Sequence, residues 1–437
     1  MEAFVTRKKR KSSPEVQQEQ EHEASEPDNE DSTDIKLAML SSLHPTFDQE
    51  TLLDFLLAHD GSVKATSQSL RQSQPKKKSG VVAQKSLRSY TVAPTGQESG
   101  PSKKPKLLSR KGATMHLFDP EDISQHTPCS IIHNFLPPED ANSLLLELLE
   151  ESKTFEKITF KLFDNVVSSP HTSSFYVGTY DELDQQKYEY VYNGARLTDV
   201  RKITPQLGKV KERVRDAVNR EIAERIRTHH GGKKLKYQSP EPWSPNAAFV
   251  NCYNGPQESV GWHSDQLTYL GPRAVIGSLS LGVTREFRVR RVVPKDSPAD
   301  SPSESSHNPD AEGQLAIHLP HNSLLIMHAE MQEEWKHSIS PATAIDPHPI
   351  AGNRRINITY RDYRESFHPR NTPRCSCDIP SVLRVVQKKS QNWGRYFWMC
   401  HAGNVPGKES CTFFQWAEFD DDGNPIGKQP AQASKTM

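Results

Sequence analysis

The sequence predicts an α+β protein centred on a double-stranded β-helix (jelly roll) with buttressing helices. A small three-helix module is expected before this domain and a small β-rich zinc module after it. Three observations lead to this prediction: short strand-like runs between Ala247 and Arg361, two amphipathic helical patterns ahead of them, and four of the six cysteines clustered after Arg374. Helices that precede such a series of strands are typical of a double sheet covered by helices.

The strand-like runs are either apolar or alternate between polar and apolar residues, and Gly, Pro and Asn separate them. They are Ala247–Tyr253, Ala274–Leu281, Phe287–Val293, Gln314–Leu319, Ser323–Met327 and Arg355–Arg361. A stretch rich in Ser, Pro and Asp, Asp296–Gly313, predicts a long hairpin insertion between two of them.

Two helices are expected ahead of the strands because apolar residues recur there at helical spacing. The first is predicted to begin at Pro138 and the second to run through the stripe from Leu207 to Ile226. The apolar positions of the first helix are Leu144, Leu145, Leu148 and Leu149.

The composition indicates that part of the 437-residue chain stays unfolded. Only 34% of the residues are hydrophobic, 32 are prolines, and the mean hydropathy is −0.74, so some segments bury too little apolar surface to offset their ordering entropy. The expected organisation is a disordered tail (1–33), a three-helix module (34–70), a disordered basic linker (71–113), the jelly-roll domain (114–366), the zinc module (372–420) and a second tail (421–437).

The distribution of charge and cysteine predicts a nuclear protein in a reducing compartment. The formal net charge is zero, but basic residues collect between Arg71 and Lys111, which suits a polyanion or an import receptor. The runs Arg7–Lys11 and Lys103–Lys106 resemble nuclear import signals. No apolar run approaches the roughly 20 residues that span a bilayer, and the clustered cysteines favour metal over disulfides.

Two motifs predict a mononuclear iron site. His263 and Asp265 lie two residues apart, so an extended backbone directs both side chains to one face. With a third ligand, taken as His337, they would form the two-histidine, one-carboxylate triad of non-haem Fe(II) oxygenases. On spacing alone, three other histidines compete for the third position: His318, His321 and His328.

The last strand-like run carries a further signal. Residues 355–361 alternate polar and apolar side chains, so Arg355, Asn357, Thr359 and Arg361 share one face of a sheet. Inside a jelly roll this face points at an interior site, and guanidinium groups bind a dicarboxylate bidentately.

In combination these motifs resemble the AlkB dioxygenases over roughly residues 115–365. The matching segments are Phe249–Tyr253 (Asn-x-Tyr), Gly261–Asp265 (His-x-Asp), Gly277–Gly282, His337-Ser338 and Arg355–Arg361 (Arg-x-Asn-x-Thr-x-Arg). The resemblance implies Fe(II) held by His263, Asp265 and His337, and 2-oxoglutarate held by Asn251, Tyr253, Arg355, Asn357 and Arg361. It also implies oxidative demethylation of N-alkylated bases in DNA or RNA, with release of formaldehyde and succinate, on a flipped or single-stranded base.

The substrate is left open by one departure from the family pattern. Members that act on 1-methyladenine or 3-methylcytosine usually carry an acidic residue after the metal-binding Asp, whereas this chain has Gln266 and Leu267. The aromatic residues Phe175, Tyr176 and Tyr180 are candidates for stacking on the base. The alternative functions are a catalytically inactive nucleic-acid-binding scaffold and an oxygenase that regulates RNA or protein side chains.

The C-terminal cysteines predict a structural zinc site. Cys375, Cys377, Cys400 and Cys411 supply the four thiolates of a tetrahedral zinc. With Gly394-Arg395 and the aromatic residues around them, these residues resemble the GRF zinc finger, which implies binding of single-stranded nucleic acid. Charge would come from Arg384, Lys388, Lys389 and Arg395, and stacking faces from Trp393, Phe397 and Trp398. Removal of this separate clamp is expected to leave the iron site untouched.

The N-terminal module resembles a CUE domain. Leu43-His44-Pro45, a leucine-rich second helix and Asp60–Val63 before a third helix form the matching pattern. The resemblance implies that residues 34–70 bind ubiquitin. His44 stands where the family usually has Phe.

Overall fold

A computed structural model describes residues 40, 49–59, 62–72, 114–162, 165–294 and 313–426. These residues fall into two units that divide after Val82. The predicted N-terminal tail, most of the basic linker, both basic runs, nearly all of the predicted hairpin insertion and most of the predicted C-terminal tail lie outside the described residues. Residues 421–426, predicted as the start of that second tail, are described, and the Ile426 amide donates to the Glu418 carbonyl of the zinc module. No helix among the described residues is long and apolar enough to cross a membrane.

The N-terminal unit contains two described helices, α2 (Gln49–Ala58) and α3 (Val63–Gln72). They enclose a small core of four fully buried leucines, Leu40, Leu52, Leu56 and Leu70. The predicted second and third helices are thus present, whereas Leu43–Pro45 lies outside the described residues. The likeness to a CUE domain and the binding of ubiquitin stay predictions.

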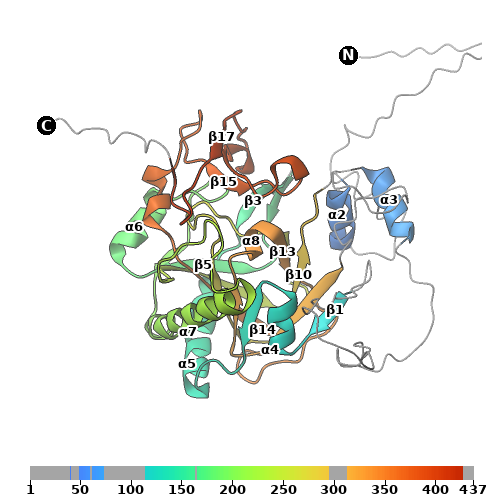
Figure 1. Cartoon of the computed structure of the whole chain (residues 1–437). Helices are drawn as coiled ribbons and strands as arrows, with labels where there is room; N and C mark the ends of the chain where they lie inside the picture. The colour runs from blue at the N-terminus through green and yellow to red at the C-terminus, as the bar shows by residue number, and fades with distance from the viewer. Residues whose placement is uncertain are drawn as a thin grey trace, which may run out of the picture. The chain divides into compact units, whose positions relative to one another are not determined.

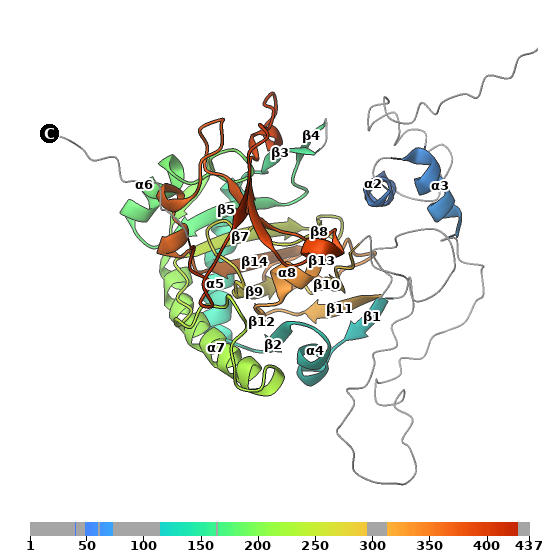
Figure 2. The same cartoon turned by 45° about the horizontal axis from the view of Figure 1, so that its top comes forward.

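The C-terminal unit is built on two mixed sheets that face each other, consistent with the predicted jelly roll (Figures 1 and 2). The five-stranded sheet has the order β1 (Thr114–Leu117), β11 (Gln314–Leu319), β10 (Arg285–Arg291), β13 (Trp335–Ile339) and β8 (Val260–His263). The seven-stranded sheet has the order β2 (Cys129–Ile132), β12 (Ser323–Met327), β9 (Ile276–Gly282), β14 (Arg354–Arg361), β7 (Ala247–Asn254), β5 (Thr172–Val177) and β6 (Val200–Lys202). Apolar side chains of both sheets, among them Phe287 and Ile276, share one core.

Helices α5 (Pro138–Glu151) and α7 (Pro205–His229) cover the outer face of the seven-stranded sheet. Each begins with a proline at its first turn, where the missing N–H costs no hydrogen bond. Most of their predicted apolar positions are buried against β7, β9 and β14, whereas Ile222 and Ile226 at the end of the second stripe are partly exposed. Shorter elements complete this unit: α4 (Pro120–His126), the β3–β4 hairpin (Thr159–Leu162 and Asn165–Ser168), α6 (Tyr180–Tyr188) and α8 (Met331–Glu334).

Strand β14 shows how the predicted alternation creates an interior polar face. Ile356, Ile358 and Tyr360 join the core formed with the helices. Arg355 and Asn357 take the opposite face of the strand and lie opposite Tyr253 and Asn251 of β7, respectively. Both polar side chains are buried, at 1% and 6% exposure.

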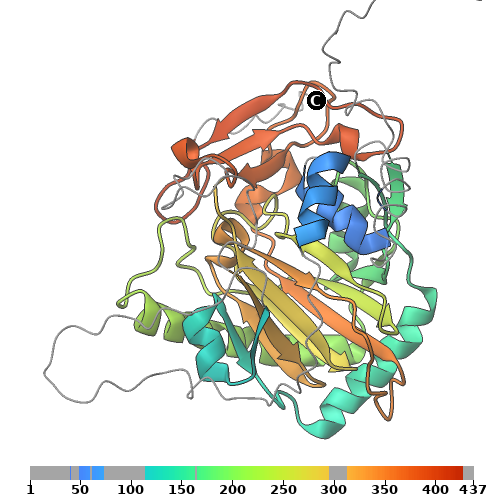
Figure 3. The same ribbon diagram turned by 90° about the vertical axis from the view of Figure 1, so that its right-hand side faces the viewer.

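The zinc module consists of strands β15 (Val382–Val385), β16 (Tyr396–Met399) and β17 (Phe414–Ala417). It packs directly on the jelly roll, as Figure 3 shows. Leu383 and Tyr396 belong to the same buried cluster as Leu267 and Met331 of the larger domain. The two modules therefore share a hydrophobic core, whereas the clamp function of the finger stays a prediction.

Candidate active site

Two histidines from neighbouring strands lie side by side between the sheets. His263 at the end of β8 pairs in register with His337 of β13, and their ring centroids are 4.2 Å apart. Burial lowers the pKa of His337 to about 4, so its imidazole is neutral and able to bind a metal at physiological pH.

Asp265 completes this cluster from the turn after β8. Its Oδ1 atom lies 3.5 Å from Nε2 of each histidine, and one ligand atom from each of the three residues falls within 4.8 Å of the others. Burial opposes ionisation of Asp265, but Arg361 and the two imidazoles outweigh it and hold the pKa of the carboxyl well below its usual range. The result is an anionic ligand with two neutral ones, the donor set of a non-haem iron site.

The other histidines weighed for the third position lie in other surroundings. His328 is fully buried, and its Nε2 is 3.1 Å from Ser130 Oγ. His318 lies against His116 on the outer strands, and His321 accepts a hydrogen bond from the Gly282 amide. Of these candidates, the structure places only His337 with His263 and Asp265.

Arg355 of β14 carries a buried guanidinium that is only partly paired. Arg355 donates through Nη2 to Ser280 Oγ at 2.8 Å and to Asn357 Oδ1, while its Nε and Nη1 atoms have no hydrogen-bond partner among the described residues. Burial lowers the pKa of Arg355 to about 10, so it remains a cation. A buried cation with two unused donors fits a bound carboxylate.

Arg361, on the same strand as Arg355, contacts the triad directly. Its Nη2 donates to Asp265 Oδ2 at 2.8 Å, which leaves Oδ1 turned toward the histidines. Its Cζ atom lies 4.7 Å from the ring centroid of Phe249. Arg361 thus orients the anionic ligand, a contact that the sequence motif did not reveal.

Several further residues at the site were missed by the sequence reasoning. His171 stacks on Tyr253 at 4.8 Å, and Arg285 is a buried cation that donates to four main-chain carbonyls. Gln332 accepts a hydrogen bond from the Asp265 amide. These residues lie outside the motif segments, so only the fold brings them to the site.

Two of the three aromatic residues considered for base stacking are buried. Phe175 and Tyr176 are each only 1% exposed, and Tyr176 donates to Glu151 Oε2 from within the core. Tyr180 is 69% exposed, with Lys202 Nζ 4.3 Å from its ring centroid. Phe175 and Tyr176 are therefore core residues. Of these three aromatic residues, Tyr180 alone is exposed and able to contact a substrate.

The four C-terminal cysteines also converge. Their sulfur atoms lie within 4.8 Å of one another, and Cys377 Sγ is 3.9 Å from Cys400 Sγ. Such spacing suits four thiolates around a tetrahedral zinc with Zn–S distances of about 2.3 Å.

Two facing sheets with two histidines and one carboxylate between them define a non-haem iron oxygenase. Residues 128–361 match the model of the 2OG-Fe(II) oxygenase superfamily, and residues 373–420 match that of the GRF zinc finger. The first match spans more than half of the chain, so the chain belongs to the 2OG-Fe(II) oxygenase superfamily. Its cofactors are Fe(II) and 2-oxoglutarate, and the four-cysteine cluster of the finger takes zinc.

The proteins similar to part of this chain include an AlkB homologue and a DNA oxidative demethylase. The chain is 35% identical over 129 residues to the alpha-ketoglutarate-dependent dioxygenase alkB homolog 3 of Mus musculus, which covers 30% of this chain and 40% of the relative. It is 30% identical over 122 residues to the DNA oxidative demethylase ALKBH2 of Arabidopsis thaliana. This match covers 26% of this chain and 37% of the relative. The chain thus spans less than half the length of these relatives.

A solved structure with a similar chain path is OsALKBH1. It is 16% identical, with a TM-score of 0.34, and covers 54% of this chain and 98% of its own.

Proposed function

We propose that this dioxygenase removes N-linked methyl groups from bases in DNA and so repairs alkylation damage. The observation that supports the proposal most directly is that β14 carries both the buried, partly unpaired Arg355 and Arg361, which donates to Asp265 of the triad. In this proposal His263, Asp265 and His337 hold Fe(II). When bound, Fe(II) and 2-oxoglutarate would supply the oxidation by O2. One oxygen atom of O2 goes to 2-oxoglutarate, which leaves as succinate and CO2, and the other goes to the methyl group, which leaves as formaldehyde while the base nitrogen keeps a hydrogen.

The residues of the pocket have separate parts in this proposal. Arg355 binds a carboxylate of 2-oxoglutarate, and Asn251, Tyr253 and Asn357 line the same face between β7 and β14. Arg361 keeps Asp265 ionised and oriented. The low pKa of His337 keeps its imidazole available to the metal at neutral pH.

A group of cations supports a nucleic acid as the substrate. Burial, Arg290, Lys388 and Arg384, in that order, lower the pKa of Lys336. Lys336 and Arg290 pair across β13 and β10 of the oxygenase domain, whereas Arg384 and Lys388 belong to the zinc finger. Positive charge therefore continues from one module to the other, as expected for a surface that follows a phosphate backbone.

The choice of DNA and of the lesion defines the test. Gln266, which follows the proposed metal ligand, donates to Thr268 Oγ1 at 2.8 Å and leaves no carboxylate at that position. The name of the Arabidopsis thaliana relative specifies DNA, which favours DNA here. The nuclear location stays a prediction.

The test is to incubate the purified protein, Fe(II) and 2-oxoglutarate with oligonucleotides that carry single methylated bases. Single-stranded DNA, duplex DNA and RNA would be compared, with His337→Ala as the inactive control. Mass spectrometry should show loss of the methyl group and matching formaldehyde, fastest with single-stranded DNA. Turnover of 2-oxoglutarate with no loss of methyl from any oligonucleotide would contradict the proposal, and preference for RNA would redirect it.

A further inference from the structure

The zinc finger meets the oxygenase domain at the short helix α8, which lies just before the strand that carries His337. Tyr396 of β16 donates its hydroxyl to Glu333 Oε1 at 3.0 Å. Gln387, which follows β15, donates to the main-chain carbonyls of Gln332 and Glu333 at 3.1 and 3.0 Å. The finger therefore holds both the main chain and a side chain of α8.

The same helix reaches the triad on its other side. The Asp265 amide donates to Gln332 Oε1 at 2.6 Å, and Gln332 is only 1% exposed. A second link runs through Thr268, three residues after Asp265, whose Oγ1 accepts from the Leu383 amide of the finger at 3.2 Å. Thus both ends of the turn that follows His263 are tied, directly or through α8, to the zinc finger.

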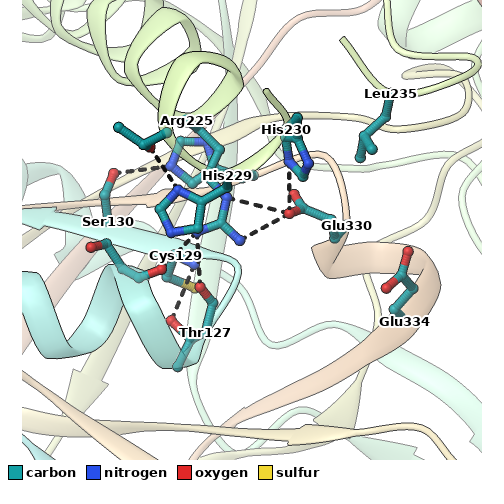
Figure 4. A network of polar contacts seen from close by, with 12 residues as sticks. Thr127, Cys129, Ser130, Arg225, His229, His230, Leu235, Glu330 and Glu334 are labelled. Carbon is teal, nitrogen blue, oxygen red and sulfur yellow. Dashed lines mark hydrogen bonds and ion pairs between the residues drawn. The ribbon is translucent and has the colours of Figure 1, made fainter. Parts of the chain in front are cut away.

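The start of α8 has a separate anchor that does not depend on the finger. Figure 4 shows Glu330 facing Arg225 of α7 and His230, the residue that follows this helix. Glu330 Oε1 lies 2.9 Å from Arg225 Nη2 and 3.1 Å from His230 Nε2. Loss of the finger would thus leave Glu330 in place and free the part of α8 that contacts Asp265.

Two glycines show how closely the modules are docked. A methyl group added to Gly423 (φ 74°), just beyond the finger, would lie 2.1 Å from the carbonyl oxygen of Tyr237. One added to Gly194 would lie 2.5 Å from the carbonyl oxygen of His401. Neither obstacle is a flexible side chain, so a larger residue at either position must separate the modules.

We propose that the docked zinc finger is a structural part of the iron site, in which Gln332 of α8 is a positioning residue for Asp265. This inference rests on the proposed role of Asp265 as a metal ligand. The finger keeps the metal-binding turn in its ligating geometry by holding α8 and Thr268. The role is additional to any contact of the finger with nucleic acid, and it replaces the expectation that loss of the finger leaves the iron site untouched.

The experiment measures Mn(II) affinity of the full-length protein by the electron paramagnetic resonance signal of free Mn(II). Mn(II) prefers the nitrogen and oxygen ligands of the triad to the thiolates of the finger. Loss of an outer-shell partner typically weakens metal binding about 10–100-fold, so Gln332→Ala should bind Mn(II) about 10–100-fold more weakly. Gln332→Glu should restore binding, because its carboxylate still accepts from the Asp265 amide.

The finger is tested by Gly423→Ala, which should weaken Mn(II) binding about tenfold although it alters no ligand. Gly407→Ala is the matched control, since Gly407 has a similar φ of 75° in the finger but no atom within 4 Å of an added methyl group; it should bind as wild type. Wild-type affinity in Gly423→Ala, with zinc retained or lost, would overturn the proposal. Asp265→Ala separates the causes: if it too binds Mn(II) normally, the metal-site assignment itself fails.

Discussion

At the scale of single residues, Asp265 is the side chain that contacts both histidines and Arg361 of this site. Its two oxygens are divided between the histidines and Arg361, and its amide is held by Gln332. A buried carboxylate is stable in its charged form only when such partners surround it. Its neighbours therefore matter for its geometry as well as for its charge.

Substitution of the triad should abolish demethylation. Asp265→Ala removes the anionic ligand and His337→Ala removes one of two imidazoles, so neither variant should release formaldehyde from a methylated oligonucleotide. His328→Ala is the control, because His328 contacts Ser130 and not the triad. An inactive, folded His328→Ala variant together with an active His337→Ala variant would contradict the assignment.

Arg355→Ala should raise the KM for 2-oxoglutarate steeply. Truncating one partner of a buried charge pair typically costs about 2–5 kcal/mol, and Arg355 is 1% exposed. Arg354→Ala, on the opposite face of the same strand, should leave the KM near its wild-type value. Steady-state assays of succinate formation check both variants, and an unchanged KM in Arg355→Ala would place this residue outside the cosubstrate pocket.

At the scale of elements, strand β12 and the residues after it are held by buried polar contacts. His328, which follows β12, is fully buried, and burial lowers its pKa to about 3. The network around Glu330 lies next to it along the chain (Figure 4). Burial favours the neutral form of His328, so the stability of this segment depends on pH.

Acid should therefore destabilise the protein in part through His328. The folded pKa lies below the unfolded value of about 6.5, so the unfolded chain takes up a proton first as the pH falls. The stabilisation is complete above about pH 6.5 and is lost as the pH falls toward 3; between pH 6.5 and 5 the loss amounts to roughly 2 kcal/mol. Urea unfolding at both pH values should show a smaller difference for His328→Gln, and an equal difference would exclude this role.

The stability of the zinc finger should likewise depend on its bound zinc. Cys400→Ser removes one of four converging thiolates, so zinc should be lost and the midpoint of thermal unfolding should fall, because Leu383 and Tyr396 then leave the shared core. Zinc content and calorimetry check this. Ser376→Ala, between two ligands, is the control, and a Cys400→Ser protein with unchanged zinc and midpoint would contradict the assignment.

At the scale of the whole molecule, the catalytic unit joins two modules through one core and one band of positive charge. The cations Lys336 and Lys388 come from different modules yet lie close enough to affect each other. Because the finger is docked, it presents its charges in a fixed relation to the oxygenase domain. A single strand bound there would contact both modules at once.

Binding of a single-stranded oligonucleotide should consequently weaken with salt. Each phosphate contact to a single strand contributes about −0.7 to the slope of log K against log salt, so Lys336→Ala and Lys388→Ala should each make the slope shallower by about 0.7. Lys153→Ala, paired with Glu150 away from this band, serves as the control. Fluorescence anisotropy over a salt series measures the slopes, and identical slopes for all proteins would remove these lysines from the interface.

Local features of this protein could be predicted from its sequence alone. Period-two alternation predicted the polar face of β14, helical spacing predicted α5 and α7, and the cysteines predicted the zinc cluster. These signals are local because backbone geometry sets which side chains share a face. His-x-Asp spacing likewise pointed to His263 and Asp265.

The way in which distant segments combine could be seen in the folded structure but not in the sequence. On spacing alone the third histidine was one of four candidates, and the resemblance implied His337; the pairing of β13 with β8 is what brings His337 beside His263. The position of Gln332 under Asp265 and the docking of the finger on α8 carry no spacing pattern, because they depend on contacts between residues far apart in the chain. Such contacts form when separate apolar surfaces are buried together, and short-range periodicity does not encode which surfaces meet.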